Sequence, residues 1–258
     1  MSSTHTVTID STHFPDQDPS HLRIHLSEPL RFPRLDYEVG LIKLEMTYSV
    51  FNVTDTSFTM LYLTPSLVLE IVAYSPGIYT IEALNERLHD VMRLNGDLTY
   101  DSNGDEVFYI SFEPNYVTGR VDLSIYDGWS IDFDTMSPLL GFNTGYLTGS
   151  VSSDYETITS PSLADINNGL TALQVRSNLA SNSFVNGEIT SVLYNFVPTS
   201  RPYMKFVVEP NQPSFTQVTS SNIDLIELFL TNQDGNQVSL NERPIKYTLQ
   251  FRPISLLA

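Results

Sequence analysis

The segment 226–251, IELFLTNQDGNQVSLNERPIKYTLQF, contains the pattern that decides the fold. Apolar residues occupy every second position in Ile226-Leu228-Leu230 near its start and in Tyr247-Leu249-Phe251 at its end. Because successive side chains of a β-strand point to opposite faces, each run predicts a strand with one buried face. Asp234-Gly235 lies between them and supplies the positive φ that a tight turn requires.

The same alternation recurs over most of the chain and predicts a mainly β protein, an antiparallel β-sandwich. Turn dipeptides such as Asn103-Gly104 and Asn186-Gly187 separate the runs, as expected for short strands joined by hairpins. The further predicted strands contain Leu22-Ile24-Leu26, Leu41 to Met46, Phe108-Ile110-Phe112, Val121-Leu123-Ile125 and Ile189 to Phe196.

A helical period is present only between Thr80 and Arg93. Ile81, Leu84, Leu88 and Val91 are spaced to form one apolar stripe, and Thr80 is a suitable N-cap. The sequence therefore predicts an α-helix there, with a second short turn over 135–140.

The predicted helix divides the sandwich strands into two groups. Ser, Thr and Asn crowd residues 144–168, which is typical of a surface connection. We therefore expect residues 1–64 and 170–258 to build the sandwich. Residues 65–169 are expected to form a central inserted α+β region that ends in this connection.

The composition restricts the classes of protein. The 258 residues include no Cys, which excludes disulfides and thiolate chemistry and suits a reducing compartment, the cytoplasm or nucleus. No secretory signal and no membrane span are visible. A formal charge of −17 disfavours direct nucleic-acid binding. This charge either keeps the protein soluble or matches a basic partner, and both interpretations stay open.

Two groups of residues invite a metal-site interpretation. His21 and His25 are four apart, but on a strand this separation is about 13 Å, too far to share one zinc ion. Residues 101–106, DSNGDE, resemble part of a calcium loop, yet the Gly comes too early for an EF-hand. We expect a hairpin tip there, and a solvated loop around Asp16 and Asp18.

Catalytic and ligand-binding patterns are also weak. Acidic pairs chosen from Glu113, Asp122, Asp127, Asp132 and Asp134 would suit a glycosidase only across a groove. Trp129 with Tyr126 would suit sugar stacking, although ordinary packing explains aromatic residues equally well. No motif predicts catalytic residues, a cofactor or a metal ion, so we expect no enzyme activity.

Several short motifs follow one another along nearly the whole chain. They are Tyr37-Glu38-Val39-Gly40-Leu41, Asn52-Val53, Gly77-Ile78-Tyr79 with Ile81-Glu82, Leu139-Leu140-Gly141-Phe142, Leu173-Gln174-Val175-Arg176-Ser177, Ile226-Glu227-Leu228, Asp234-Gly235 and Leu249-Gln250-Phe251-Arg252. Their order resembles that of the minor capsid, or penton, proteins of Polinton/Maverick elements and of related adintovirus and virophage-like particles.

The resemblance implies a single jelly roll, five copies of which close an icosahedral vertex beside a trimeric major capsid protein. It implies a homopentamer located in the virion and made in the host cytoplasm or nucleus, with the inserted region projecting outward and no catalytic residues. Two other hypotheses remain: a receptor- or carbohydrate-binding spike module that uses Trp129, and a glycan hydrolase that uses Asp132 and Asp134.

Overall fold

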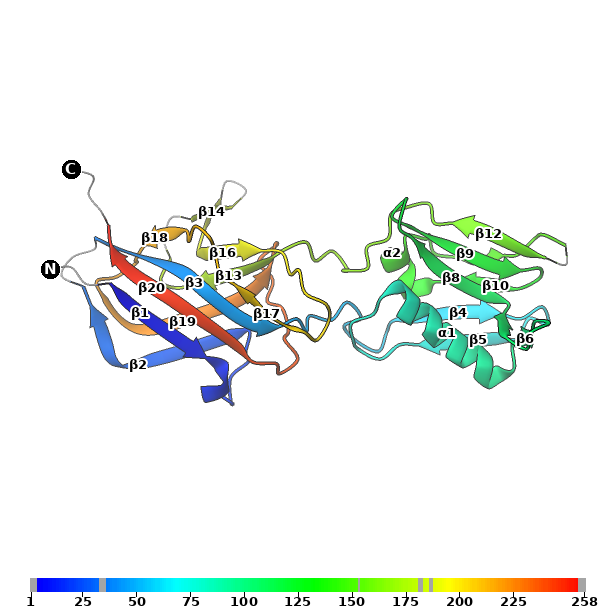
Figure 1. Cartoon of the computed structure of the whole chain (residues 1–258), viewed down its shortest axis with the longest axis horizontal. Helices are drawn as coiled ribbons and strands as arrows, with labels where there is room; N and C mark the ends of the chain where they lie inside the picture. Colours follow the sequence, from blue (N-terminus) through cyan, green and yellow to red (C-terminus); the bar gives the residue numbers. More distant parts are fainter. Residues whose placement is uncertain (1–3, 33–35, 153, 181–182, 186–187, 255–258) are drawn as a thin grey trace. The chain divides into compact units, whose positions relative to one another are not determined.

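The computed structural model describes residues 4–32, 36–152, 154–180, 183–185 and 188–254. The chain forms two compact units, one built from residues 1–50 and 170–258 and the other from 51–169 (Figure 1). The first boundary differs from the expected position at residue 64. Strand β4 (Thr59–Leu63) pairs with β5 and β10 of the second unit, which removes it from the sandwich.

The first unit is a single jelly roll of two antiparallel sheets, which confirms the expected fold class. One sheet has the order β1 (His5–Asp10), β20 (Ile245–Pro253), β3 (Tyr37–Thr47) and β17 (Lys205–Val208), with β18 (Phe215–Gln217) also on β3. The other has the order β16 (Val192–Phe196), β13 (Leu173–Ser177), β19 (Asn222–Asn232) and β2 (His21–Arg31). Chain order repeatedly crosses between the sheets, as in a jelly roll.

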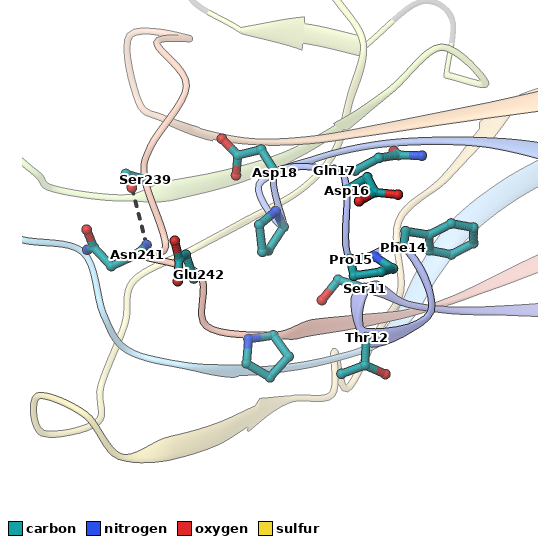
Figure 2. Close-up of a pocket in the computed structure, with 12 residues that line it drawn as sticks. Ser11, Thr12, Phe14, Pro15, Asp16, Gln17, Asp18, Ser239, Asn241 and Glu242 are labelled. Carbon is teal, nitrogen blue, oxygen red and sulfur yellow. Dashed lines mark hydrogen bonds between the residues drawn. The ribbon is translucent and has the colours of Figure 1, made fainter.

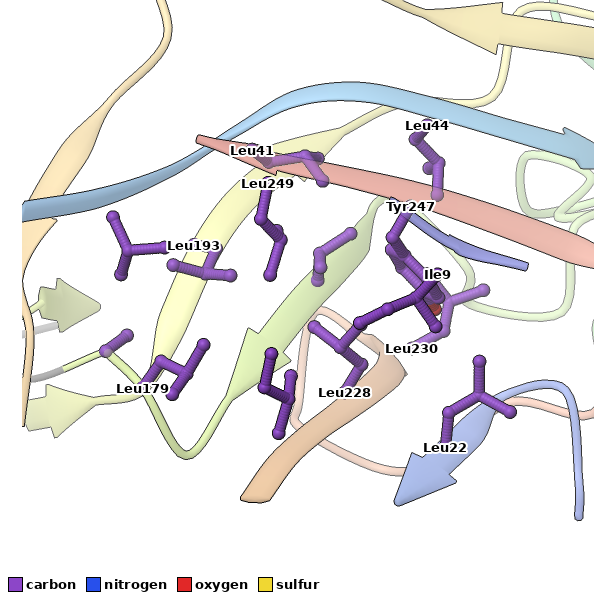
Figure 3. Close-up of a cluster of buried hydrophobic side chains, with 14 of the residues drawn as sticks. Ile9, Leu22, Leu41, Leu44, Leu179, Leu193, Leu228, Leu230, Tyr247 and Leu249 are labelled. Carbon is purple, nitrogen blue, oxygen red and sulfur yellow. The ribbon is translucent and has the colours of Figure 1, made fainter. Parts of the chain in front are cut away.

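The jelly-roll core lies between the two sheets (Figure 3). Leu228 and Leu230 of β19 face Tyr247 and Leu249 of β20, and all four are fully buried. The pairing of β20 with β3 changes register between Thr248 and Leu249. This irregularity lets β3 bury both Leu41 and Leu44, which simple alternation would place on opposite faces.

Two short elements complete the first unit. A 3-10 turn, η1 (Ser11–His13), follows β1, and β14 (Ser183–Val185) pairs with β15 (Glu188–Thr190). The turn expected at Asn186-Gly187 lies outside the described residues.

The second unit interrupts the jelly roll between β3 and β13. One sheet has the order β11 (Leu147–Thr148), β10 (Ser130–Asp132), β4 and β5 (Leu69–Ala73). Another has the order β12 (Tyr155–Thr159), β9 (Arg120–Tyr126) and β8 (Ile110–Asn115), and β6 (Leu98–Tyr100) pairs with β7 (Glu106–Phe108). A 3-10 turn, η2 (Asp134–Met136), leads into a one-turn helix, α2 (Ser137–Leu140).

The predicted helix is α1 (Ile81–Asn95). The Thr80 hydroxyl accepts the Ala83 N–H, and Gly96 adopts the left-handed conformation at the C-terminus. Its buried face contains Leu84, Leu88 and Met92, and it packs on β8. The helix therefore covers part of a core that contains Tyr62, Phe112, Trp129 and Phe133.

Candidate functional site

A hollow of about 900 Å³ in the jelly roll is formed by the loop after β1 and the loop before β20 (Figure 2). Its lining combines polar and apolar surface. Asp16, Asp18 and Glu242 bring carboxylates to it, and Phe14 with three prolines supplies apolar surface. The hollow is open, unlike the deep clefts that usually enclose small molecules.

Asp18 has a structural role in this hollow. Its Oδ1 accepts hydrogen bonds from the Ser20 N–H and hydroxyl, both at 2.8 Å, and its Oδ2 accepts one from the Gln237 amide at 3.1 Å. The carboxylate therefore ties the first loop to the segment between β19 and β20.

The two histidines considered as metal ligands lie on strand β2, as the alternation predicts. The His21 ring stacks on Phe229 of the neighbouring strand with 4.4 Å between centroids, whereas His25 is exposed. A second hollow contains both, together with Asp18 and Arg23. Among the described residues, no three His, Asp or Glu side chains form a group that could hold a metal ion.

Residues 101–105 form the tip of the β6–β7 hairpin. The Asp101 Oδ1 accepts the backbone N–H groups of Asn103 and Asp105 at 2.8 and 2.9 Å. These backbone hydrogen bonds, that of Asp105 first, lower the pKa of Asp101. The first carboxylate of the sequence that resembles a calcium loop therefore stabilises the hairpin turn through these hydrogen bonds.

The stacking surface proposed around Trp129 is not available in this structure. Trp129 is only 6% exposed, and its ring stacks on Tyr109 at 4.7 Å and contacts Tyr62. Tyr126 contacts Tyr109 and Tyr155. The single tryptophan is therefore part of the core, where Tyr109 stacks on its ring and Tyr62 of β4 packs beside it.

The carboxylates named for glycan hydrolysis both accept hydrogen bonds within the structure. Asp132 Oδ1 accepts the N–H groups of Asp134 and Gly145, and Asp134 Oδ2 accepts the Thr59 hydroxyl at 2.6 Å. Asp132 therefore fixes the turn that follows β10, and Asp134 ties this turn to strand β4.

A better placed pair is Glu113 and Asp122, which lie directly opposite each other on β8 and β9. Both line a hollow of about 520 Å³ with His89 and Tyr155. Hydrogen bonds from Thr159 and then Asn115 lower the pKa of Asp122. A glycosidase acid requires a raised pKa, so this carboxylate is shifted in the wrong direction for that role.

The two units differ strongly in charge. Residues 51–169 contain 17 Asp and Glu, three Arg and no Lys, a net charge of −14, whereas the rest of the chain contains 13 acidic and ten basic residues, a net charge of −3. The whole-chain charge of −17 conceals this asymmetry until the boundaries are known. The insertion, and not the jelly roll, is the acidic part of the protein.

Comparisons with known proteins support the architecture. No family model matches the sequence, and no curated protein matches it. The fold is a jelly roll with an inserted unit. A crystal structure of the selenomethionine-labelled mavirus penton protein has a similar fold, with a TM-score of 0.51 and 12% sequence identity, over 98% of this chain and all of that chain. The fold of this chain is therefore penton-like. No helix in the described part of the chain is long and apolar enough to cross a membrane.

Proposed function

We propose that the protein is a structural virion protein, a minor capsid subunit that assembles as a homopentamer at icosahedral vertices. The observation that carries this proposal is the full-length similarity of fold to the mavirus penton protein, which includes both the jelly roll and its insertion. The order of sequence motifs independently favours penton proteins of Polinton/Maverick elements, adintoviruses and virophage-like particles.

The jelly roll suits ring assembly on physical grounds. A ring uses two different surfaces of each subunit in a head-to-tail contact that closes after a fixed number of copies. The outer strands β1 and β17 of one sheet, and β2 and β16 of the other, provide edges on which neighbouring subunits can pack. The major capsid protein is the second partner that this function requires.

The acidic insertion agrees with a place away from the genome. With a net charge of −14 it is repelled by phosphate, so direct nucleic-acid binding is disfavoured. We infer that the insertion projects from the vertex. In this function the protein acts through contacts of its surface with other proteins and catalyses no reaction. It is located in the virion, after synthesis in the host cytoplasm or nucleus.

Light scattering of the purified full chain tests this function. Over a concentration series we expect a discrete species of five times 29.0 kDa, either alone or after addition of the major capsid protein. Imaging of assembled particles should then place the protein at the fivefold vertices. The proposal would be refuted if the protein stayed a monomer at every concentration, with and without the major capsid protein, and were absent from the vertices. That result would favour a binding module.

A further inference from the structure

The outer face of the β4–β5 hairpin is aliphatic. Leu61 lies opposite Ile71, and Leu63 lies opposite Leu69, so the four side chains share one face. Leu69 and Ile71 are 50% and 59% exposed, while Met60, Tyr62 and Val72 on the other face are buried. A hairpin with apolar side chains on both faces has one face in its own core and another available to a partner.

The same hairpin ends its sheet, since β5 pairs only with β4 among the described strands. The Thr64 N–H donates to the Val68 carbonyl, and the Tyr74 N–H donates to the Phe58 carbonyl. Val68 and Tyr74, just before and just after β5, are therefore positions whose backbone bonds toward the β4 side. In an antiparallel pair the bonded positions alternate, so the backbone groups of Leu69 and Ile71 point to the open edge. The Arg87 Nε–H donates to the Ala73 carbonyl at 3.2 Å, which caps the end of this edge.

Strand β5 lacks three of the devices by which proteins protect an edge. The sequence of Leu69–Ala73, LEIVA, contains no Lys and no Pro, and its pairing with β4 has no register shift. Exposed Leu67 and Val68 extend the aliphatic surface into the turn. Leu69 and Ile71 therefore combine backbone N–H and C=O groups that point to the open edge with exposed aliphatic side chains.

Charge indicates which partner fits. Glu70 lies opposite Tyr62, so its side chain is on the face of β5 away from Leu69 and Ile71. It is the carboxylate of the edge strand itself. The three Arg residues of the unit already contact other groups: Arg87 the Ala73 carbonyl, Arg120 the Ser160 carbonyl, and Arg93 three carboxylates. A second copy would bring together two units of net charge −14, whereas a basic segment would be attracted.

We propose that strand β5 accepts an added β-strand from another protein, a segment in which aliphatic residues alternate with Lys or Arg. The backbone of the segment bonds to Leu69 and Ile71, and its aliphatic side chains lie beside theirs on the outer face of the hairpin. Its basic side chains point to the opposite face, on the side of Glu70. This surface lies within the insertion, so the inference does not rest on the proposed capsid function.

A peptide of about nine residues that alternates Val and Lys tests the proposal by fluorescence anisotropy with the full chain. We expect saturable binding that weakens with added salt, and no binding of the peptide that alternates Val and Glu. The variant Leu69→Thr/Ile71→Thr should weaken binding about tenfold or more, because Thr keeps the preference for strand but removes the aliphatic contact. The matched control Leu163→Thr replaces an equally exposed leucine of the same unit and should leave binding unchanged.

N-methylation separates strand addition from simple charge attraction. A Val–Lys peptide methylated on all its backbone nitrogens keeps its side chains but cannot donate hydrogen bonds along either edge, and it should lose binding. A dissociation constant above about 1 mM for the unmethylated peptide would overturn the proposal, as would tight binding of the methylated peptide or no effect of the double variant. Self-association of the full chain that Leu69→Thr/Ile71→Thr abolishes would overturn it in favour of a second copy as the occupant.

Discussion

The imidazole of His89 lies flat on the ring of Phe108, with 3.8 Å between the ring centroids and 4° between the planes. The contact joins helix α1 to the β6–β7 hairpin. Burial lowers the pKa of His89, against weaker opposing effects of Glu86, the Ile110 backbone and Glu106, while Arg93 adds to the lowering. The folded protein therefore favours the neutral ring.

This relationship predicts acid sensitivity of the insertion. Since the pKa of His89 is lower in the folded chain than its ordinary value of 6.5, the stabilising effect is present above pH 6.5 and is lost as the pH falls below it. The urea midpoint, followed by fluorescence of Trp129, should fall between about pH 7 and pH 5. His89→Phe should flatten this dependence, whereas His21→Phe, which keeps a ring against Phe229, should not. Equal pH profiles of the wild type and His89→Phe would contradict the assignment.

The hydroxyl of Tyr247 should be dispensable. Tyr247 is fully buried in the jelly roll, and its hydroxyl has no hydrogen-bond partner among the described residues. Because an unpaired buried hydroxyl is unfavourable, Tyr247→Phe should raise the free energy of unfolding by about 1 kcal/mol. The matched variant Tyr74→Phe should lower it by a similar amount, since the Tyr74 hydroxyl donates to the Leu84 carbonyl at 2.9 Å. Calorimetry of both variants checks the opposite signs.

Asn52 joins the two ends of the insertion. Its side-chain amide donates to the carbonyls of Tyr79 and Ile166 at 2.8 and 2.6 Å, and its Oδ1 accepts the Tyr79 N–H at 2.9 Å. Asn52→Ala leaves these groups unpaired and should destabilise the unit by about 3 kcal/mol. Asn103→Ala, at an exposed hairpin tip, should change stability by under about 0.5 kcal/mol. Denaturant titrations with Trp129 emission report both, and similar midpoints for the two variants would argue against this role.

Trp129 should matter for stability and not for sugar binding. Its ring is enclosed by Tyr62 and Tyr109, so Trp129→Ala should lower the free energy of unfolding by about 3–5 kcal/mol. Circular dichroism during thermal unfolding measures this loss, and Trp129→Phe should be milder. Selective loss of affinity for an oligosaccharide, with unchanged stability, would instead restore the stacking hypothesis.

The sequence predicted the parts of the fold that depend on local patterns. The runs Ile226-Leu228-Leu230 and Tyr247-Leu249-Phe251 lie in β19 and β20, and the Thr80 cap begins α1 as expected. Strand β12 was missed within the polar stretch 144–168, because Tyr155, Thr157 and Thr159 have strand preference without apolar alternation.

Long-range pairing accounts for what the sequence could not predict. Strand β4 is a short apolar run that would fit the sandwich equally well, and only its partners β5 and β10 place it in the insertion. Burial of Trp129 likewise depends on Tyr62 and Tyr109, which are distant in the chain. The apolar run Leu67–Leu69 is visible in the sequence and marks the aliphatic face of β5. Its exposure to solvent could not be predicted, because this exposure depends on the position of β5 at the edge of its sheet.

The Asn52 contacts also have a consequence for the order of events during folding. Strands β3 and β13 are separated by more than 120 residues, so bringing them together across an unfolded insertion carries a large loop-closure entropy. Once the insertion has folded and Asn52 has bonded to Ile166, the effective loop shrinks to about ten residues, which reduces that cost by about 2 kcal/mol. The topology therefore favours early folding of the insertion, after which the two jelly-roll sheets close across a short effective connection.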